Sequence, residues 1–120
     1  MRIARIATAD GPRSVLADGP DWIEIADPFA GTLRPTGPRH PAATATLLAP
    51  ARPLVVLGMA HNGAPGDRDR PRQAFLKSPR TVVGPGDSIV VDDDLGQINV
   101  ECELAVVIRR PCRHLTADQV

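Results

Sequence analysis

Aromatic residues are scarce in this chain, and their scarcity limits the core that it can build. Only 2% of its 120 residues are aromatic, comprising one Trp, two Phe and no Tyr. A buried core must therefore consist of Val, Ile, Leu and Ala, which bury less area per side chain than aromatic rings. We expect a thin hydrophobic core.

Long hydrophobic runs and an excess charge of either sign are also missing. Apolar stretches such as residues 54–57 and 104–108 are far shorter than the roughly 20 residues of a transmembrane helix, and the amino terminus has no signal-peptide pattern. The 14 basic and 14 acidic residues cancel and form no basic cluster. The sequence predicts a cytoplasmic protein that binds neither nucleic acid nor a membrane.

Cysteine and lysine are nearly absent. Cys102 and Cys112 are accompanied by no export signal, and Cys102 adjoins an apolar run, so free thiols are expected rather than a disulfide. Lys77 is the only lysine in a chain with 14 basic residues. As the only lysine, Lys77 is a candidate functional residue.

Short β-like runs bounded by Gly and Pro are what the sequence does contain. Residues 2–7, 13–17 and 21–26 are separated by Asp10-Gly11-Pro12 and Asp18-Gly19-Pro20, which are turn sequences, so they predict a small β meander. Residues 27–50 are rich in Pro, Gly, Thr and Ala without periodicity and predict an ordered connector. We therefore expect a small amino-terminal β domain with its connector over residues 1–50.

Residues 51–120 predict a second, also mostly β, domain. Its expected strands are residues 53–58, 73–77, 81–83, 88–91 and 98–108, and Gly84-Pro85-Gly86-Asp87 suits a turn because Pro presets φ and Gly tolerates positive φ. Residues 59–72 fit neither helix nor strand, and loops of this length usually have a function. Asp92-Asp93-Asp94 is interpreted as a polar turn between strands.

Residues 115–120 predict the start of a helix. Thr116 suits the N-cap, and Asp118 and Gln119 occupy first-turn positions where an acidic group and a capping-box partner are favoured. One turn is not stable by itself, because nucleation is unfavourable until later turns pack. We expect the natural fold to continue beyond Val120, or a second polypeptide to supply the rest.

Two glutamates in residues 98–108 are candidate metal ligands. Period-two alternation in a strand places Glu101 and Glu103 on one face, with Cα atoms roughly 6.6 Å apart, and Cys102 on the other. On a buried face the two charges would require a proton, an Arg or a metal ion. Oxygen ligands favour Mg²⁺, followed by Mn²⁺ or Ca²⁺. The alternative is that both glutamates face water on an edge strand, where charges prevent unwanted pairing.

The order of four motifs resembles the fumarylacetoacetate hydrolase family over essentially the whole chain. The four segments are Leu57-Gly58-Met59-Ala60-His61-Asn62, a strand-to-loop segment; Phe75-Leu76-Lys77-Ser78-Pro79, similar to Phe-x-Lys-x-Pro; Gly84-Pro85-Gly86-Asp87-Ser88-Ile89, similar to Gly-Pro-Gly-Asp-x-Ile; and Glu101-Cys102-Glu103-Leu104-Ala105-Val106-Val107-Ile108, similar to Glu-x-Glu-Leu-x-Val-Val-Ile. The amino-terminal meander also resembles the small β domain that many members carry.

This resemblance implies a mixed β-roll catalytic domain, of which residues 51–120 are the first part, and a protein that is usually dimeric. It implies Mg²⁺ or Mn²⁺ bound by Glu101, Glu103 and an aspartate farther along the chain. The implied substrates are 2-oxo or 1,3-diketo acids, which family members hydrolyse at a C–C bond, decarboxylate, hydrate or isomerise. In each reaction the cation holds the substrate oxygens and stabilises an enolate.

The catalytic site of a family enzyme would be incomplete in these 120 residues, so we expect the chain alone to be inactive. Its expected partners are a small oxo acid and either a second copy, in a homodimer, or a complementary carboxy-terminal chain. The alternatives are a non-catalytic or split subunit that pairs with a second chain, and a small β binding module without chemistry.

Two further residues are catalytic candidates. Many members carry Asn-Tyr-x-x-His after the strand glycine, but Ala64 stands at the position of that His and His61 lies three positions earlier. His61 therefore either serves as an acid/base from a rearranged loop or caps the strand end. Lys77 lies in the family-like motif, where it holds a substrate carboxylate, orients a metal ligand, or extends its ammonium group from a strand into water.

Overall fold

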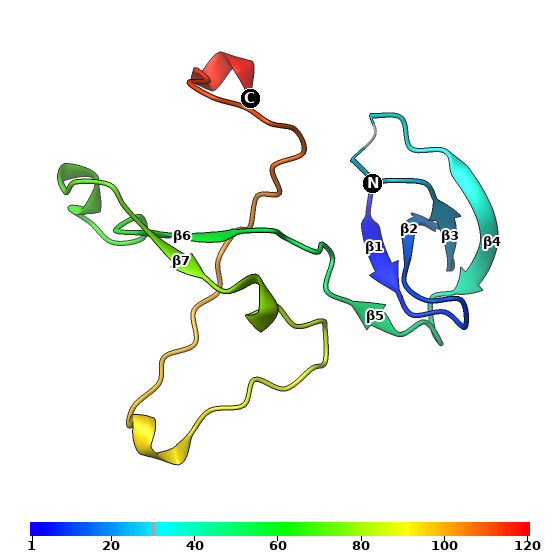
Figure 1. Cartoon of the computed structure of the whole chain (residues 1–120), viewed down its shortest axis with the longest axis horizontal. Coiled ribbons are helices and arrows are strands. Elements are labelled where there is room, and N and C mark those ends of the chain that lie inside the picture. The colour runs from blue at the N-terminus through cyan, green and yellow to red at the C-terminus, as the bar shows by residue number, and fades with distance from the viewer. Residues whose placement is uncertain (30) are drawn as a thin grey trace.

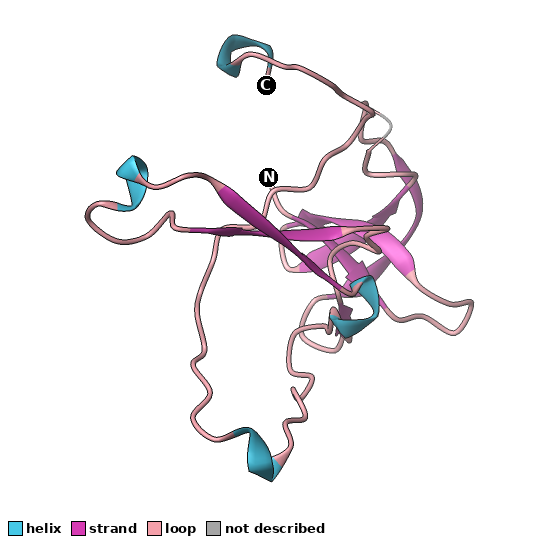
Figure 2. Cartoon of the chain, turned by 60° about the vertical axis from the view of Figure 1, so that its left-hand side comes forward, coloured by secondary structure: helices cyan, strands magenta, loops and turns pink. Residues whose placement is uncertain are grey.

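Two antiparallel β-sheets form the framework of the chain (Figure 1). The computed structural model describes residues 1–29 and 31–120. The larger sheet has five strands in the order β4-β3-β2-β1-β5, and the smaller pairs β6 with β7. Figure 2 shows that the helices of the described residues are isolated single turns, which are all of the 3-10 type. The predicted mostly β fold class is confirmed.

The predicted meander is present as β1 (Ile3–Ile6), β2 (Arg13–Asp18) and β3 (Asp21–Ile25), paired antiparallel in sequence order. Asp18 pairs with Asp21 across a two-residue turn in which Gly19 has φ 60°. A positive φ at the first central residue followed by Pro is the pattern of a type II′ turn, whose twist matches that of the flanking strands. The turn chemistry thus fixes the register of β2 and β3.

The prediction of a connector without strands over residues 27–50 is wrong. This region forms β4 (Pro35–Pro41), which pairs with β3, and β5 (Leu47–Leu48), which pairs with β1. β4 is an edge strand, where a Pro that lacks an N–H can face solvent without breaking a ladder bond. Arg39 of β4 also forms ion pairs with Asp18 and Asp21, which hold this Pro-rich strand on the sheet.

The core of the larger sheet is as thin as the composition predicts. Among the described residues, the buried hydrophobic side chains are Ile6, Val15 and Ile25, with exposed fractions of 1%, 0% and 6%. None is aromatic, and one comes from each strand of the meander. The buried core of the described residues is therefore made of three aliphatic side chains.

The smaller sheet is a hairpin of β6 (Val56–Ala60) and β7 (Gln73–Lys77). Its register pairs Gly58 with Phe75, and the long loop between the strands contains one 3-10 turn, Asp67–Asp69. The strand predicted over residues 73–77 is confirmed, whereas the one predicted over 53–58 begins later, at Val56. The long loop therefore projects from one end of the hairpin.

The strands predicted over residues 81–83, 88–91 and 98–108 are wrong. In the structure these segments follow an irregular path with no ladder partner among the described residues. A strand exists only when its backbone N–H and C=O groups pair with a neighbour, and sequence alternation cannot supply that neighbour. By contrast the predicted turn at Gly84 is confirmed, since the Asp87 amide donates to the Gly84 carbonyl at 3.2 Å and Gly86 has φ 83°.

The predicted helix start forms a single 3-10 turn, Ala117–Gln119. Gln119 Oε1 accepts from the Thr116 amide at 2.9 Å, as expected of a capping-box partner. The Thr116 hydroxyl donates to Asp118 at 2.5 Å and lowers the pKa of that carboxyl, because the bond favours its charged form.

The two cysteines are free thiols, as predicted, and both are exposed. Within the part of the chain that the structure describes, no helix has the length and apolar character required to cross a lipid bilayer.

Candidate functional site

An open cavity of about 540 Å³ brings together the segments that the sequence analysis singled out. It is lined by Met59 and Ala60 at the end of β6, by residues 61–64 and Asp67 of the long loop, by Phe75 of β7, and by residues 101–103. The last of these segments crosses beside β6, as the orange part of the chain in Figure 1 shows. Residues more than 25 positions apart in sequence thus share one concave surface.

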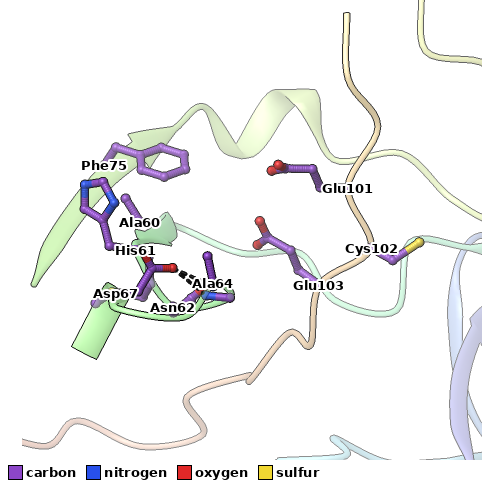
Figure 3. A pocket seen from close by; sticks show the side chains of 11 residues that line it. Ala60, His61, Asn62, Ala64, Asp67, Phe75, Glu101, Cys102 and Glu103 are labelled. Carbon is purple, nitrogen blue, oxygen red and sulfur yellow. Dashed lines mark hydrogen bonds between the residues drawn. The ribbon is translucent and has the colours of Figure 1, made fainter. Parts of the chain in front are cut away.

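Glu101 and Glu103 extend their carboxylates to the same side, toward the loop, while Cys102 extends to the opposite side (Figure 3). The predicted alternation is therefore confirmed, because an extended backbone alternates its side chains whether or not it is paired. Of the two alternatives for this segment, the buried face is excluded because both glutamates are exposed, and the segment is not an edge strand either. In water, two charges about 6 Å apart repel by only about 0.7 kcal/mol, so the pair needs no counter-charge to persist.

The opposite wall of the cavity is a tight loop that carries His61. Asp67 closes this loop by accepting hydrogen bonds from the Gly63 amide at 3.1 Å and the Ala64 amide at 2.6 Å. His61 itself has φ 58°, a left-handed conformation that non-glycine residues adopt rarely and often at functional positions. Figure 3 shows His61 across the cavity from the two carboxylates.

Phe75 completes the cavity wall and lies directly over β6. A Cβ atom added at Gly58 would come within 2.3 Å of Phe75 Cζ, so the ring occupies the space that a side chain at position 58 would need. Lys77 Nζ lies 5.6 Å from the centroid of the same ring, in the range of a cation–π contact. Lys77, expected at the site, therefore stands beside the wall and not among the lining residues.

Two of these contributors were not identified from the sequence. Asp67 is the residue that shapes the loop, and the signal for it was an Asp following Gly63-Ala64 at a spacing where its side chain can accept their amide hydrogens. Phe75 was noted only as part of a motif. Its exposure to the cavity depends on the cross-strand pairing with Gly58, which no local pattern reveals.

We expect Gly58→Ala to displace Phe75 from the cavity wall. The clash is with the ring tip, the far end of a rotatable side chain, so the ring should swing away while the hairpin persists, at a cost of about 1 kcal/mol. Contacts between the Phe75 ring protons and the backbone of residues 57–59, measured by NMR, should disappear.

Gly63→Ala is the matched control, because nothing lies within 4 Å of a Cβ added there. It should preserve the Phe75 contacts. Unchanged contacts in Gly58→Ala would show that the position of the Phe75 ring does not require a glycine in the strand beneath it.

Glu101 and Glu103 supply a donor set that suits a hard divalent cation. Mg²⁺ is commonly held by one or two carboxylates and several waters, so two glutamates facing one open cavity fit this ion. Within residues 1–29 and 31–120, no group of three or more His, Cys, Asp or Glu side chains is arranged to hold a metal ion. Among the described residues, the carboxylate pair is thus what the cavity would offer to such an ion.

Comparison with family models assigns both parts of the chain. Residues 44–120 match the fumarylacetoacetate hydrolase C-terminal model, and residues 1–50 match the Rv2993c-like N-terminal model. A curated relative, Protein Rv2993c of Mycobacterium tuberculosis, is 33% identical over 99% of this chain. The chain spans 50% of the length of that relative.

Solved structures give the same fold. An uncharacterised protein from Mycobacterium abscessus is 34% identical with a TM-score of 0.68, over 78% of this chain and 40% of its own. The 2-hydroxyhepta-2,4-diene-1,7-dioate isomerase from Mycobacterium marinum is 34% identical with a TM-score of 0.55, over 69% of this chain and 34% of its own.

Proposed function

The chain belongs to the fumarylacetoacetate hydrolase family, and from this premise we propose that it carries the cation-binding and proton-transfer part of an enzyme that isomerises unsaturated 2-oxo acids. The observation that supports the proposal most is the cavity itself, into which two carboxylates project from one side and a histidine loop from the other. The isomerase identity of the M. marinum protein favours isomerisation among the reactions of the family.

Glu101 and Glu103 would hold Mg²⁺ or Mn²⁺ at the mouth of the cavity. When bound, the cation supplies Lewis-acid stabilisation of the negative charge that builds up on the oxygen of a 2-oxo acid as it enolises. The carboxylates of both glutamates point toward the cavity because the extended backbone places the two side chains on one face. A third ligand would come from outside residues 98–108.

His61 would move the proton that isomerisation requires. Its loop is closed by the Asp67 carboxylate, its backbone is left-handed, and its side chain lines the cavity. An imidazole can both accept and return a proton, which an acid/base residue must do. This role replaces that of the family histidine, whose position is occupied by Ala64.

The experiment joins residues 1–120 to the carboxy-terminal half of the M. tuberculosis relative and measures enol–keto conversion of an unsaturated 2-oxo acid. We expect turnover with Mg²⁺ or Mn²⁺ and none after EDTA. His61→Ala should lower kcat by roughly 100- to 10,000-fold, the usual contribution of a positioned acid/base. His114→Ala, in an exposed residue outside the cavity, is the control and should retain full activity.

Turnover in EDTA, or full activity of His61→Ala, would contradict the proposed chemistry. A second candidate function, a non-catalytic subunit that pairs with a second chain, is favoured by the extended path of residues 98–108, which have no ladder partner among the described residues. It predicts stable assembly with the complementary half but no turnover with any oxo acid, so the same preparation distinguishes the two.

A further inference from the structure

The Phe75 ring is an aromatic side chain that the fold leaves partly exposed at the cavity, as it also leaves Phe29 partly exposed elsewhere. It is one of only two Phe in the chain, yet 44% of the residue remains exposed and it lines the cavity. The buried core of the described residues contains no aromatic side chain, although an aromatic ring would bury more area than Ile or Val. The ring therefore gives the cavity wall an aromatic surface that the core of the fold does not use.

The surroundings of the Phe75 ring leave it accessible to a molecule in the cavity. Gly58 leaves the strand beneath it bare, so the ring can lie across β6. The Lys77 ammonium group lies 5.6 Å from its centroid, which favours a fixed ring position through a cation–π attraction. In Figure 3 the ring extends over the space between the His61 loop and the two carboxylates. A molecule held near Glu101 and Glu103 would therefore lie within reach of a flat aromatic surface.

We propose that Phe75 is a specificity-determining residue that stacks on the planar, conjugated part of the ligand and selects long unsaturated 2-oxo acids over short ones. The inference rests on the proposed function, since the acid head of the ligand is held at the carboxylate side of the cavity. Stacked π systems prefer offset, parallel surfaces, which a conjugated chain offers and a saturated chain does not. Pyruvate, which has no tail, gains nothing from the ring.

The test compares two probes with the joined protein described under Proposed function, in the presence of Mn²⁺, by isothermal titration calorimetry. Benzylidenepyruvate is a 2-oxo acid with a planar conjugated tail, and pyruvate has the same head without the tail. We expect Phe75→Ala to weaken benzylidenepyruvate roughly ten-fold, as loss of an aromatic contact predicts, and to change pyruvate less than about two-fold. Phe75→Leu, which keeps an apolar side chain without a planar face, should recover only part of the loss.

Leu76→Ala is the matched control, because Leu76 is the adjacent β7 residue, points to the other face and is 74% exposed. It should bind both probes as the parent chain does. Equal weakening of both probes in Phe75→Ala, no weakening of either, or full recovery in Phe75→Leu would each overturn the inference.

Failure of this inference and failure of the proposed function give different results. Suppose that Glu101→Gln/Glu103→Gln loses pyruvate binding but Phe75→Ala leaves the ratio of the affinities for the two probes unchanged. The proposed function then stands and the role of Phe75 does not. Suppose instead that Phe75→Ala weakens the binding of benzylidenepyruvate but Glu101→Gln/Glu103→Gln changes the affinity for neither probe. The stacking role then stands and the cation-dependent function does not. If neither probe binds to the joined protein without substitutions, both the function and the role of Phe75 are overturned.

Discussion

The double substitution Glu101→Gln/Glu103→Gln should abolish divalent cation binding by the chain. Gln has the size of Glu but lacks the charge, so the substitution removes the electrostatic attraction while leaving the shape of the cavity unchanged. Loss of a supporting outer-shell partner alone typically costs about 10- to 100-fold in metal affinity, and loss of two direct ligands should cost more. Titration with Mn²⁺, followed by the electron paramagnetic resonance signal of the free ion, measures the affinity.

The control for this experiment is Asp93→Asn/Asp94→Asn, which removes the same two charges from an exposed 3-10 turn outside the cavity. It should leave Mn²⁺ affinity within about two-fold of the parent, since charges in bulk solvent beyond a Debye length contribute little. Equal affinity of the glutamate variant and the parent chain would mean that the carboxylate pair is only a solvated surface feature.

Replacing Ile6 by Ala should destabilise the larger sheet by about 2–5 kcal/mol, the usual cost of removing a buried branched aliphatic side chain. Ile6 is 1% exposed and is one of only three buried hydrophobic residues in the described part of the chain. A small domain is stable by only about 5–15 kcal/mol, so the loss is a large share of the total. Urea unfolding followed by the fluorescence of Trp22, the only Trp and a residue of β3, measures it.

Ile3→Ala in the same strand is the matched control, because Ile3 is 37% exposed and its removal leaves no enclosed cavity. It should cost clearly less than Ile6→Ala. Similar losses for the two substitutions would indicate that β1 is stabilised by its ladder bonds rather than by the buried side chain.

The meander could be predicted because its turns and strands are determined by residues that are close together in the sequence. The turn residues around Gly11 and Gly19 tolerate the positive φ that these turns need, and short runs of aliphatic residues between them mark the strands. The Gly84 turn and the cap at Thr116 were predicted for the same reason. In each case the residues that determine the conformation are close neighbours in the sequence.

The errors concern strand pairing, which is not local. Three Pro residues in β4 argued for a connector, and only its position at the edge of the sheet makes them acceptable. Residues 98–108 alternate as a strand should, yet they have no partner among the described residues. Sequence periodicity reports which face a side chain occupies but not whether a neighbouring strand exists.

The site was predictable to the extent that it depends on single segments. The shared side of Glu101 and Glu103 followed from alternation, and His61 followed from the motif that ends β6. The closure of the loop by Asp67 and the position of Phe75 over Gly58 depend on contacts across the hairpin, so their importance emerged only from the three-dimensional arrangement.

Paramagnetic broadening by Mn²⁺ in the NMR spectrum of the isotope-labelled chain locates a bound cation directly. If Glu101 and Glu103 hold the ion at the cavity, the amide signals of residues 101–103 and of the loop at 60–64 should broaden first, at substoichiometric Mn²⁺, and signals of β1 to β3 should remain sharp. Broadening that begins at residues 92–94, or that is equal at all exposed Asp and Glu residues, would contradict a cation site in this cavity.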